Sequence, residues 1–376
     1  LLGLLLACGD DAADESEVEV PAKLALVADW FNGSISYVDA AKLATATTRA
    51  ELVTSTIDLA AYPPGPVDVA LTPDKKTALV SSSTGFFAIP ASGFLIGATS
   101  IPTGPGKLLM LDVASGAVTA TLEAGPGPMA IQITPDGKRA IAANFGSGGL
   151  STADGTLVVI DLENKKITET IPAGLFPEEL AFDDSGTVAI FGFGDAGSLR
   201  TFSVADPKNT LSPEIELAGD SAGVAFFPGT KIAFGVQAPA VAAILTGGDA
   251  KGGYTLVDVT DPKLPVVLED VRLDENPIGY PVIPAKNRAS VLVPATVGTR
   301  LVLREYELAD KKAVLSGTID IGDASLLAAL GAAYDGDHTA VLALPGQRAL
   351  AVVDLNAKTA RKIDWLPEAG PADVTF

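Results

Sequence analysis

The 376-residue sequence has one cysteine, Cys8, and one histidine, His338. With only one of each, the chain cannot form multi-histidine copper or zinc sites or attach haem through Cys-x-x-Cys-His. The scarcity of both residues also argues against Ser-His-Asp and Cys-His catalytic sites. Basic residues are also scarce, since 26 Lys and Arg stand against 46 Asp and Glu, for a formal net charge of -20. Such a charge repels phosphate backbones, so we expect no nucleic-acid partner.

Long hydrophobic runs are missing as well. The apolar run at the N-terminus, residues 1–7, is far too short to span a bilayer. It ends in Leu5-Leu6-Ala7-Cys8, which resembles the lipobox of a bacterial lipoprotein signal peptide. We therefore interpret residues 1–8 as a signal remnant with a lipidated Cys8, and the alternative is an incidental thiol. With Cys8 acylated, the folded part has no thiol for disulfides or thiolate metal sites.

Residues 9–21 are acidic and contain few large apolar side chains. Such a segment cannot bury enough apolar surface to fold alone, so we expect a flexible, solvated tether. An acidic cluster behind a lipidated cysteine also resembles export signals of some surface lipoproteins, but a spacer is the simpler interpretation.

Aromatic residues make up only 6% of the chain, whereas 38 Gly and 26 Pro are available for turns. The stretch from Pro135 to Gly174 shows how they are used. It alternates short, β-branched or apolar strand-like pieces with turns such as Pro135-Asp136-Gly137-Lys138. Together with the strand before it, this makes one four-stranded antiparallel sheet. A sheet of this size cannot bury both faces alone, so it must stack on copies of itself.

Degenerate copies of this unit recur along the chain. The end of the third strand is the clearest marker, with two apolar residues followed by an acid, or by Ser in one copy. The seven markers end at Asp39, Asp112, Asp161, Ser203, Asp258, Glu307 and Asp354. Apart from one long gap, this spacing is typical of a four-stranded propeller blade.

The two ends of the repeat region complement each other. Residues 370–376 (GPADVTF) copy residues 65–71 (GPVDVAL), an innermost strand, while residues 24–28 begin the region as a second strand. We expect the last strand to complete the first blade and close the ring, which removes exposed sheet edges. The predicted fold is an all-β, seven-bladed β-propeller of four-stranded antiparallel blades over residues 22–376.

The unit resembles the YVTN-type β-propeller repeat, in its Pro-Asp-Gly-Lys turn, in Ala143-Asn144 after the second strand, and in Val159-Ile160-Asp161. The resemblance covers residues 22–376 and implies a propeller, but it leaves function open because propellers carry many functions. YVTN-like lactonases, by this resemblance, use His and Arg at a polar channel mouth. This chain offers no histidine there, because His338 aligns with a turn on the opposite face and is expected to be a solvated turn residue.

Propeller geometry places the three largest insertions on one face: residues 84–106, 146–155 and 238–253. Loops on a rigid scaffold are frequent binding sites. The first insertion is unusually apolar for a surface loop, and its apolar residues include Phe86, Phe87, Phe94 and Leu95. These residues are candidates for contact with a partner protein, a hydrophobic ligand or a membrane, and the alternative is a loop that packs on itself over the channel mouth. The sequence Gly192 to Gly197 spells GxGxxG, but no helix follows, so we assign it no nucleotide-binding role.

Acidic residues follow the prolines that begin several innermost strands. Asp68, Glu178, Glu179 and Asp373 are expected near the channel mouth, with Tyr280 close by. Converging carboxylates there could bind a cationic group or hold a hard cation such as calcium through oxygen ligands. The alternative is a set of ordinary solvated acids in an acidic chain.

From these observations we expect an envelope-anchored bacterial lipoprotein, periplasmic or on the cell surface, that is a monomer and contacts the membrane through its lipid only. Its expected role is a non-catalytic binding or scaffold module for an envelope protein or small ligand, without a cofactor. The alternative is an enzyme, a lactonase-like hydrolase or a dehydrogenase-type propeller, that works from carboxylates at the channel mouth.

Overall fold

The computed structural model describes residues 18–84, 106–146, 155–193, 197–217, 219–238, 252–273, 281–325, 329–366 and 370–376. Cys8, Tyr280 and the four apolar residues of the first insertion lie outside these ranges. No helix in the described part is long and apolar enough to cross a membrane.

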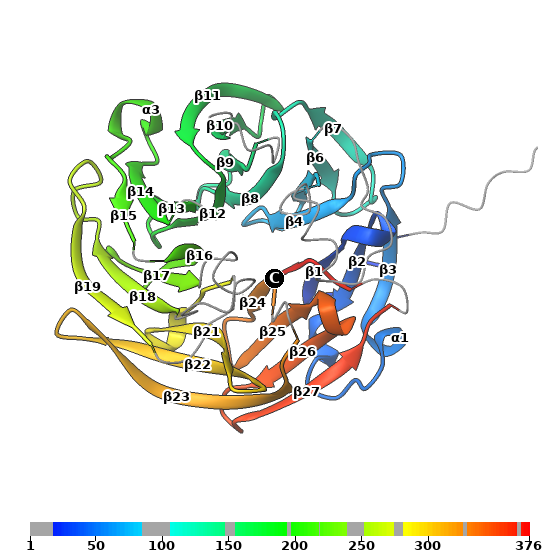
Figure 1. Ribbon diagram of the computed structural model, residues 1–376. Coiled ribbons are helices and arrows are strands. Elements are labelled where there is room, and N and C mark those ends of the chain that lie inside the picture. The colour runs from blue at the N-terminus through cyan, green and yellow to red at the C-terminus, as the bar shows by residue number, and fades with distance from the viewer. Residues whose placement is uncertain are drawn as a thin grey trace, which may run out of the picture.

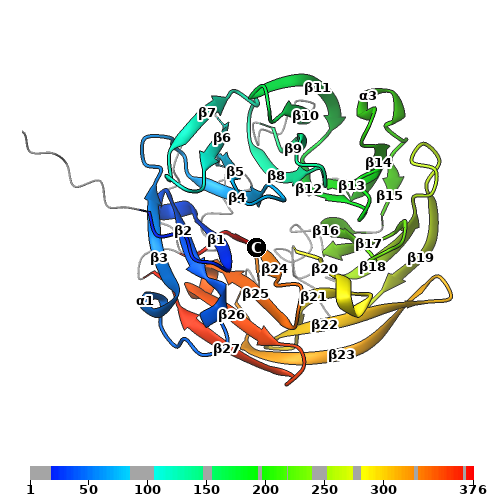
Figure 2. The same cartoon turned by 180° about the vertical axis from the view of Figure 1, so that it is seen from behind.

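The predicted fold is confirmed. Seven four-stranded antiparallel sheets stand around a central axis like blades, and the C-terminus lies at the centre of the ring (Figures 1 and 2). We name the blades A to G in chain order. Blade A contains β28 (Asp373–Thr375), β1 (Leu24–Asp29), β2 (Ser34–Asp39) and β3 (Val53–Asp58).

The other blades each follow the chain from the innermost to the outermost strand. Blade B contains β4 (Pro66–Leu71), β5 (Thr77–Ser82), β6 (Lys107–Asp112) and β7 (Val118–Leu122). Blade C contains β8 (Pro128–Ile133), β9 (Arg139–Asn144), β10 (Gly155–Asp161) and β11 (Lys166–Gly174). Blade D contains β12 (Pro177–Phe182), β13 (Val188–Phe193), β14 (Ser198–Ser203) and β15 (Ile215–Glu216). Blade E contains β16 (Asp220–Phe226), β17 (Ile232–Ala238), β18 (Gly253–Asp258) and β19 (Val266–Arg272). Blade F contains β20 (Ile283–Ala285), β21 (Ser290–Val297), β22 (Arg300–Ala309) and β23 (Lys312–Asp323). Blade G contains β24 (Ala332–Tyr334), β25 (Thr339–Leu344), β26 (Ala349–Asp354) and β27 (Thr359–Asp364).

Short helices occupy some of the connections. The 3-10 turns are η1 (Trp30–Asn32), η2 (Ala40–Lys42), η4 (Lys286–Arg288) and η5 (Pro345–Gln347), and the α-helical turns are α1 (Arg49–Leu52) and α3 (Pro207–Thr210). Residues 40–52 therefore form an elaborated hairpin connection between β2 and β3. Glu51 fixes it by accepting hydrogen bonds from the backbone N–H groups of Thr47 and Thr48.

The antiparallel order gives the ring two distinct faces. The links between first and second strands and between third and fourth strands lie on one face, which we call the turn face. The links between second and third strands and between blades lie on the other, the mouth face, where the innermost strands begin. On the turn face, Thr134 Oγ1 donates a hydrogen bond to Asp136 Oδ1 at 2.6 Å, and Gly137 takes φ +69°. The repeated Pro-Asp turn is thus held by its own side chains.

Apolar side chains fill the spaces between neighbouring blades. Although aromatic residues are few, they are concentrated there: Phe191, Phe193 and Phe202 pack together at the interface of blades C and D. Phe234 and Tyr254 stack at the interface of blades E and F, with ring centroids 4.9 Å apart. The core is therefore a ring of separate inter-blade layers rather than one central cluster.

The chain's own tail closes the ring. β28 pairs with β1 in antiparallel register, with Thr375 opposite Leu26 and Asp373 opposite Ala28. Ala372 N adds a hydrogen bond of 2.8 Å to Ala28 O, and Val374 is buried in the layer between blades G and A. This confirms the predicted closure.

A buried acid fastens the same seam between blades A and G. Asp29, at the end of β1, is fully buried and accepts hydrogen bonds from Ser36 Oγ at 2.6 Å and Trp365 Nε1 at 2.5 Å. Arg49 donates to Ser36 Oγ and lies over the Trp365 ring, 5.1 Å from its centroid. Burial raises the pKa of Asp29 to about 6, although its two hydrogen bonds and Arg49 act in the opposite direction.

This seam makes stability depend on pH. Because the folded state binds the Asp29 proton more tightly than the unfolded chain does, the free energy of unfolding should fall as pH rises from the ordinary value of 3.8 to about 6. The contribution of Asp29 to this fall is roughly 3 kcal/mol. We expect Asp29→Asn to remove that part of the slope in urea unfolding measured from pH 4 to 7. Asp364→Asn, an exposed acid on β27, is the control, and an equal flattening in both variants would contradict the prediction.

Candidate functional site

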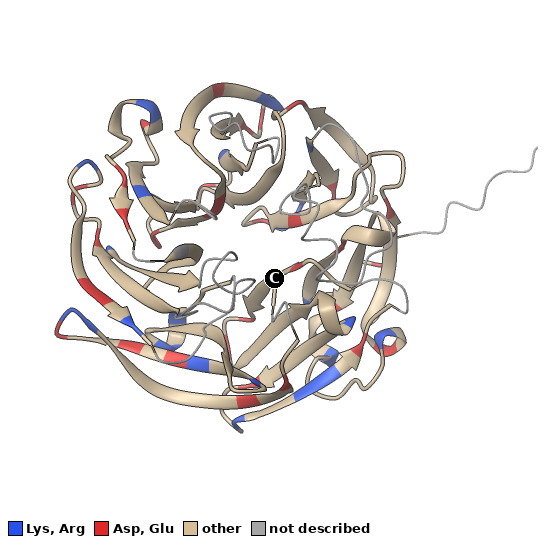
Figure 3. Cartoon of the chain, in the orientation of Figure 1, with Lys and Arg blue, Asp and Glu red and all other residues tan. Residues whose placement is uncertain are grey.

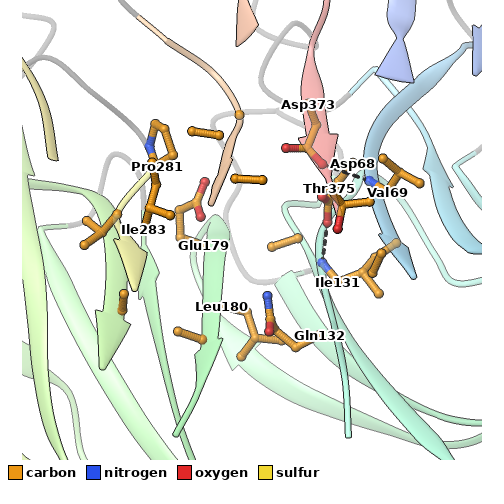
Figure 4. A pocket seen from close by; sticks show the side chains of 18 of the residues that line it. Asp68, Val69, Ile131, Gln132, Glu179, Leu180, Pro281, Ile283, Asp373 and Thr375 are labelled. Atoms are coloured by element: carbon orange, nitrogen blue, oxygen red, sulfur yellow. Dashed lines mark hydrogen bonds between the residues drawn. The ribbon is translucent and has the colours of Figure 1, made fainter. Parts of the chain in front are cut away.

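The seven innermost strands surround a cavity of about 380 Å³ on the central axis. Residues of all seven blades line it, from Val67 in blade B to Thr375 in blade A (Figure 4). Its described lining contains four acids and no Lys, Arg or His; the acids are Asp68, Glu178, Glu179 and Asp373. The structure thus brings together the four acids that the sequence predicts at the channel mouth.

Asp68 and Asp373 occupy the same position in adjacent blades and form a side-chain pair. Asp68 Oδ2 accepts a hydrogen bond of 2.5 Å from Ile131 N in blade C, and Asp373 Oδ2 accepts one of 3.1 Å from Val69 N in blade B. Each carboxyl group therefore reaches one blade further around the ring. The pair links blades A, B and C at the point where the ring closes.

Burial raises the pKa of both carboxyl groups. The pKa of Asp373 rises further because the Asp68 charge lies beside it and Asp68 hydrogen-bonds to it, and the same bond opposes the rise at Asp68. Two acids this close in a low-dielectric site cannot both ionise readily, so they hold one proton between them.

Glu179 lies across the channel from this pair and points into the open space (Figure 4). Burial raises its pKa well above the ordinary value, and the charges of Glu178 and Asp68 raise it further. Glu179 sits at the start of β12, where a β-bulge between Pro177 and Glu179 separates it from its neighbour Glu178. Glu178 itself is buried, with 5% of its surface exposed.

Small residues leave this level of the channel open. Strand register places Ala130 and Gly331 in the blades on either side of the Asp68–Asp373 pair, at the positions equivalent to Asp68. A Cβ atom at Gly331 would overlap the backbone and carboxyl group of Asp373. The absence of a side chain there lets the closing strand lie against blade G.

A calcium site finds no support in this geometry. Within the described ranges, no three acidic, histidine or cysteine side chains come close enough together to hold a metal ion. The carboxyl groups of Asp68 and Asp373 bond to each other and accept from two backbone N–H groups, which leaves Glu179 as the acid that faces the cavity without a hydrogen bond to the described residues. The site suits a cationic organic group better than a hard cation.

The remaining predicted residues separate into two groups. His338 lies in the turn between β24 and β25, beside Asp337, on the turn face as expected. Gly192 lies within β13, and Gly197 directly precedes β14. Tyr280, Cys8, Phe86, Phe87, Phe94 and Leu95 fall outside the described residues. Gln132 and Thr375 also line the cavity, and the alternation of side chains along innermost strands would have been the signal for them.

Comparison with known proteins adds the fold alone. No family model matches the chain, and no curated protein matches it either. The chain is similar to a functionally unknown protein of Desulfotomaculum acetoxidans, with a TM-score of 0.63 and 16% identity over 89% of this chain and 93% of that one. It is also similar to hydrazine synthase of Kuenenia stuttgartiensis, with a TM-score of 0.61 and 13% identity over 96% of this chain and 99% of that one.

The acid pair can be tested by titration. Asp68→Asn removes the neighbouring charge, so we expect the pKa of Asp373 to fall. The measurement is the pH dependence of the Asp373 carboxyl carbon signal by NMR. Glu179→Gln is the matched control, since Glu179 does not contribute to the shift at Asp373. An unchanged Asp373 titration in Asp68→Asn would show that the two groups are not paired.

Proposed function

We propose that the protein is a non-catalytic binding module whose channel mouth takes a small ligand with a cationic group. The observation that carries this proposal is a cavity of about 380 Å³ whose described lining has four acids and no basic residue. An ionised Glu179 without a partner is costly in the buried cavity, and a cation that enters would pair with it and offset that cost. Apart from Gln132 and Thr375, the other side chains of the described lining are small or apolar, which suits the organic part of such a ligand.

We infer the cellular setting from the sequence. The Leu5-Leu6-Ala7-Cys8 lipobox and the acidic segment behind it support a lipoprotein anchored to a bacterial envelope membrane, periplasmic or on the cell surface. The repeat pattern supports membership of the YVTN-type propellers. The apolar insertion with Phe86 and Phe94 remains the proposed contact for an envelope protein on the mouth face.

Calorimetric titration with putrescine, choline and agmatine tests the ligand class. We expect at least one of these cations to bind at low salt, and binding to weaken with added salt because the attraction is screened. Glu179→Gln should weaken the binding of putrescine or agmatine by roughly 10- to 150-fold, since a hydrogen bond between charged groups contributes ~1.5–3 kcal/mol. Binding should strengthen as pH rises, because the raised pKa of Glu179 keeps it protonated in acid.

Glu169→Gln is the matched control, because Glu169 is exposed on the outer strand β11. Equal weakening in the two variants, or no binding by any of the three cations, would contradict the proposal.

A second candidate is an enzyme that works from the same carboxyl groups. The Asp68–Asp373 pair favours it, because two acids that share a proton can serve as general acid and general base. If this function holds, a panel of lactone, ester and glycoside hydrolysis and of dehydrogenation should show an activity. Replacing Asp68, Glu179 and Asp373 together with Ala should abolish that activity, whereas Glu169→Ala should retain it. An activity that survives the triple substitution would contradict catalysis at the channel mouth.

A further inference from the structure

The N-terminal segment reaches the propeller on the turn face. Glu19 N donates a hydrogen bond of 2.8 Å to Ser55 Oγ on β3, and Thr54 Oγ1 donates one of 2.7 Å to Glu19 O. Val18 packs with the layer between blades A and B, beside the β6–β7 turn at Gly116. Contacts with the propeller therefore begin before residue 22, and they lie on the face opposite the channel mouth.

This attachment limits where Cys8 can lie. Val18 is ten residue steps from Cys8, and an extended chain covers at most about 35 Å over that length. A lipid on Cys8 would therefore hold the propeller close to its membrane. Because the segment leaves from the turn face, it would hold that face nearer to the membrane than the mouth face.

The turn face also carries the main exposed apolar surface of the described chain. Leu264 is 70% exposed, and it lies in the turn that leads into β19. Four more aliphatic side chains follow at the starts of outer strands β19 and β23, with 44% to 57% of their surface exposed: Val266, Val267, Val314 and Leu315. We call these five residues the rim patch. Of the two other large apolar residues exposed in the described ranges, Val20 belongs to the N-terminal segment and Leu175 lies at the mouth face.

The rim patch spans two neighbouring blades. β19 and β23 are the outer strands of blades E and F (Figure 1). Ala313 N on β23 donates a hydrogen bond of 3.2 Å to Glu269 Oε2 on β19, and Tyr254 OH donates to Ala313 O. These contacts place the start of β23, which carries Val314 and Leu315, beside the middle of β19.

Lysines border the patch. Lys263 precedes Leu264. Asp310 and Lys311 form the tip of the β22–β23 hairpin and Lys312 begins β23, so the end of this hairpin is mostly blue in Figure 3. Lys311 Nζ also forms an ion pair of 3.2 Å with Asp258. Apolar side chains beside lysines suit the surface of a bilayer, where the aliphatic groups are buried and the ammonium groups stay at headgroup level. A second copy of this chain fits less well, because two bodies of strong negative charge repel each other.

We propose that the turn face rests on the phospholipid bilayer through the rim patch, so that the channel mouth opens away from the membrane. The inference rests on the proposed lipid anchor at Cys8. It adds that the propeller has one fixed orientation, in which its ligand enters from the aqueous side. It departs from the expectation that the lipid alone contacts the membrane.

Fluorophore labelling of the full-length acylated chain in phosphatidylcholine vesicles tests the orientation. Leu264→Cys and, separately, Val314→Cys provide a thiol for an environment-sensitive fluorophore. Thr299→Cys is the matched control, since Thr299 is exposed in the β21–β22 turn on the mouth face of blade F. We expect a blue shift and several-fold stronger quenching by brominated phosphatidylcholine at positions 264 and 314 than at position 299.

Three results would overturn the proposal, each in a different way. Equal quenching at all three positions on vesicle-bound protein would refute the orientation while leaving the anchor intact. A blue shift that appears without vesicles as protein concentration rises would assign the rim patch to a second copy. Labelling of the wild-type chain at Cys8, together with failure to float with vesicles, would refute the anchor, and the orientation with it. The calorimetric titration of the channel mouth is independent of all three results.

Discussion

The pairing of β28 with β1 is the constraint on which the rest of the structure depends. Each blade is a small twisted sheet whose two faces are buried only when blades stand on both sides of it. An open ring would leave the layer between blades A and G half exposed, together with the edge of β1. The described strand that prevents this is only three residues long. Its short ladder is supplemented by Asp29, which receives hydrogen bonds from both sides of the seam.

Closure also creates the electrostatics of the channel. Asp373 and Asp68 lie far apart in sequence and become neighbours only because the tail strand stands beside blade B. Once the ring is closed, seven innermost strands begin at one level, and any acid there loses much of its hydration. The cost of ionising two such acids together leads them to share a proton, while Glu179 faces them across the cavity. A bound cation would favour loss of protons from such partly ionised acids, because it stabilises the carboxylate form.

Local chemistry made most of the fold predictable. The Pro135-Asp136-Gly137 turn and the acids that end third strands are properties of short segments, so they mark each blade without tertiary information. The closure could be predicted because residues 370–376 repeat residues 65–71. The positions of Asp68, Glu179 and Asp373 at the channel mouth followed from the same repeat, since equivalent residues of a ring lie at one level.

The details of the site could not be obtained in this way. Whether an acid at the mouth is solvated or buried depends on the width of the channel, and Gly331 helps to set that width by allowing β28 to approach blade G. The coupling of Asp68 to Asp373 depends on a side-chain contact between two blades, which no repeat pattern encodes. The Asp29–Trp365 bond was missed for the same reason, because Trp365 follows the outermost strand of blade G while Asp29 ends a second strand of blade A.

The same topology places the exit of the N-terminal segment and the acids of the channel mouth on opposite faces of the ring. A tail that supplies the innermost strand of blade A leaves the N-terminal part to enter as its second strand, and a second strand starts on the turn face. The chain that precedes β1 must then leave from that face, as the contacts of Glu19 with Thr54 and Ser55 show. The acids at the starts of the innermost strands lie at the opposite end of the channel for the same topological reason. With this closure, the proposed anchor before β1 and the proposed ligand at the channel mouth would lie on opposite faces.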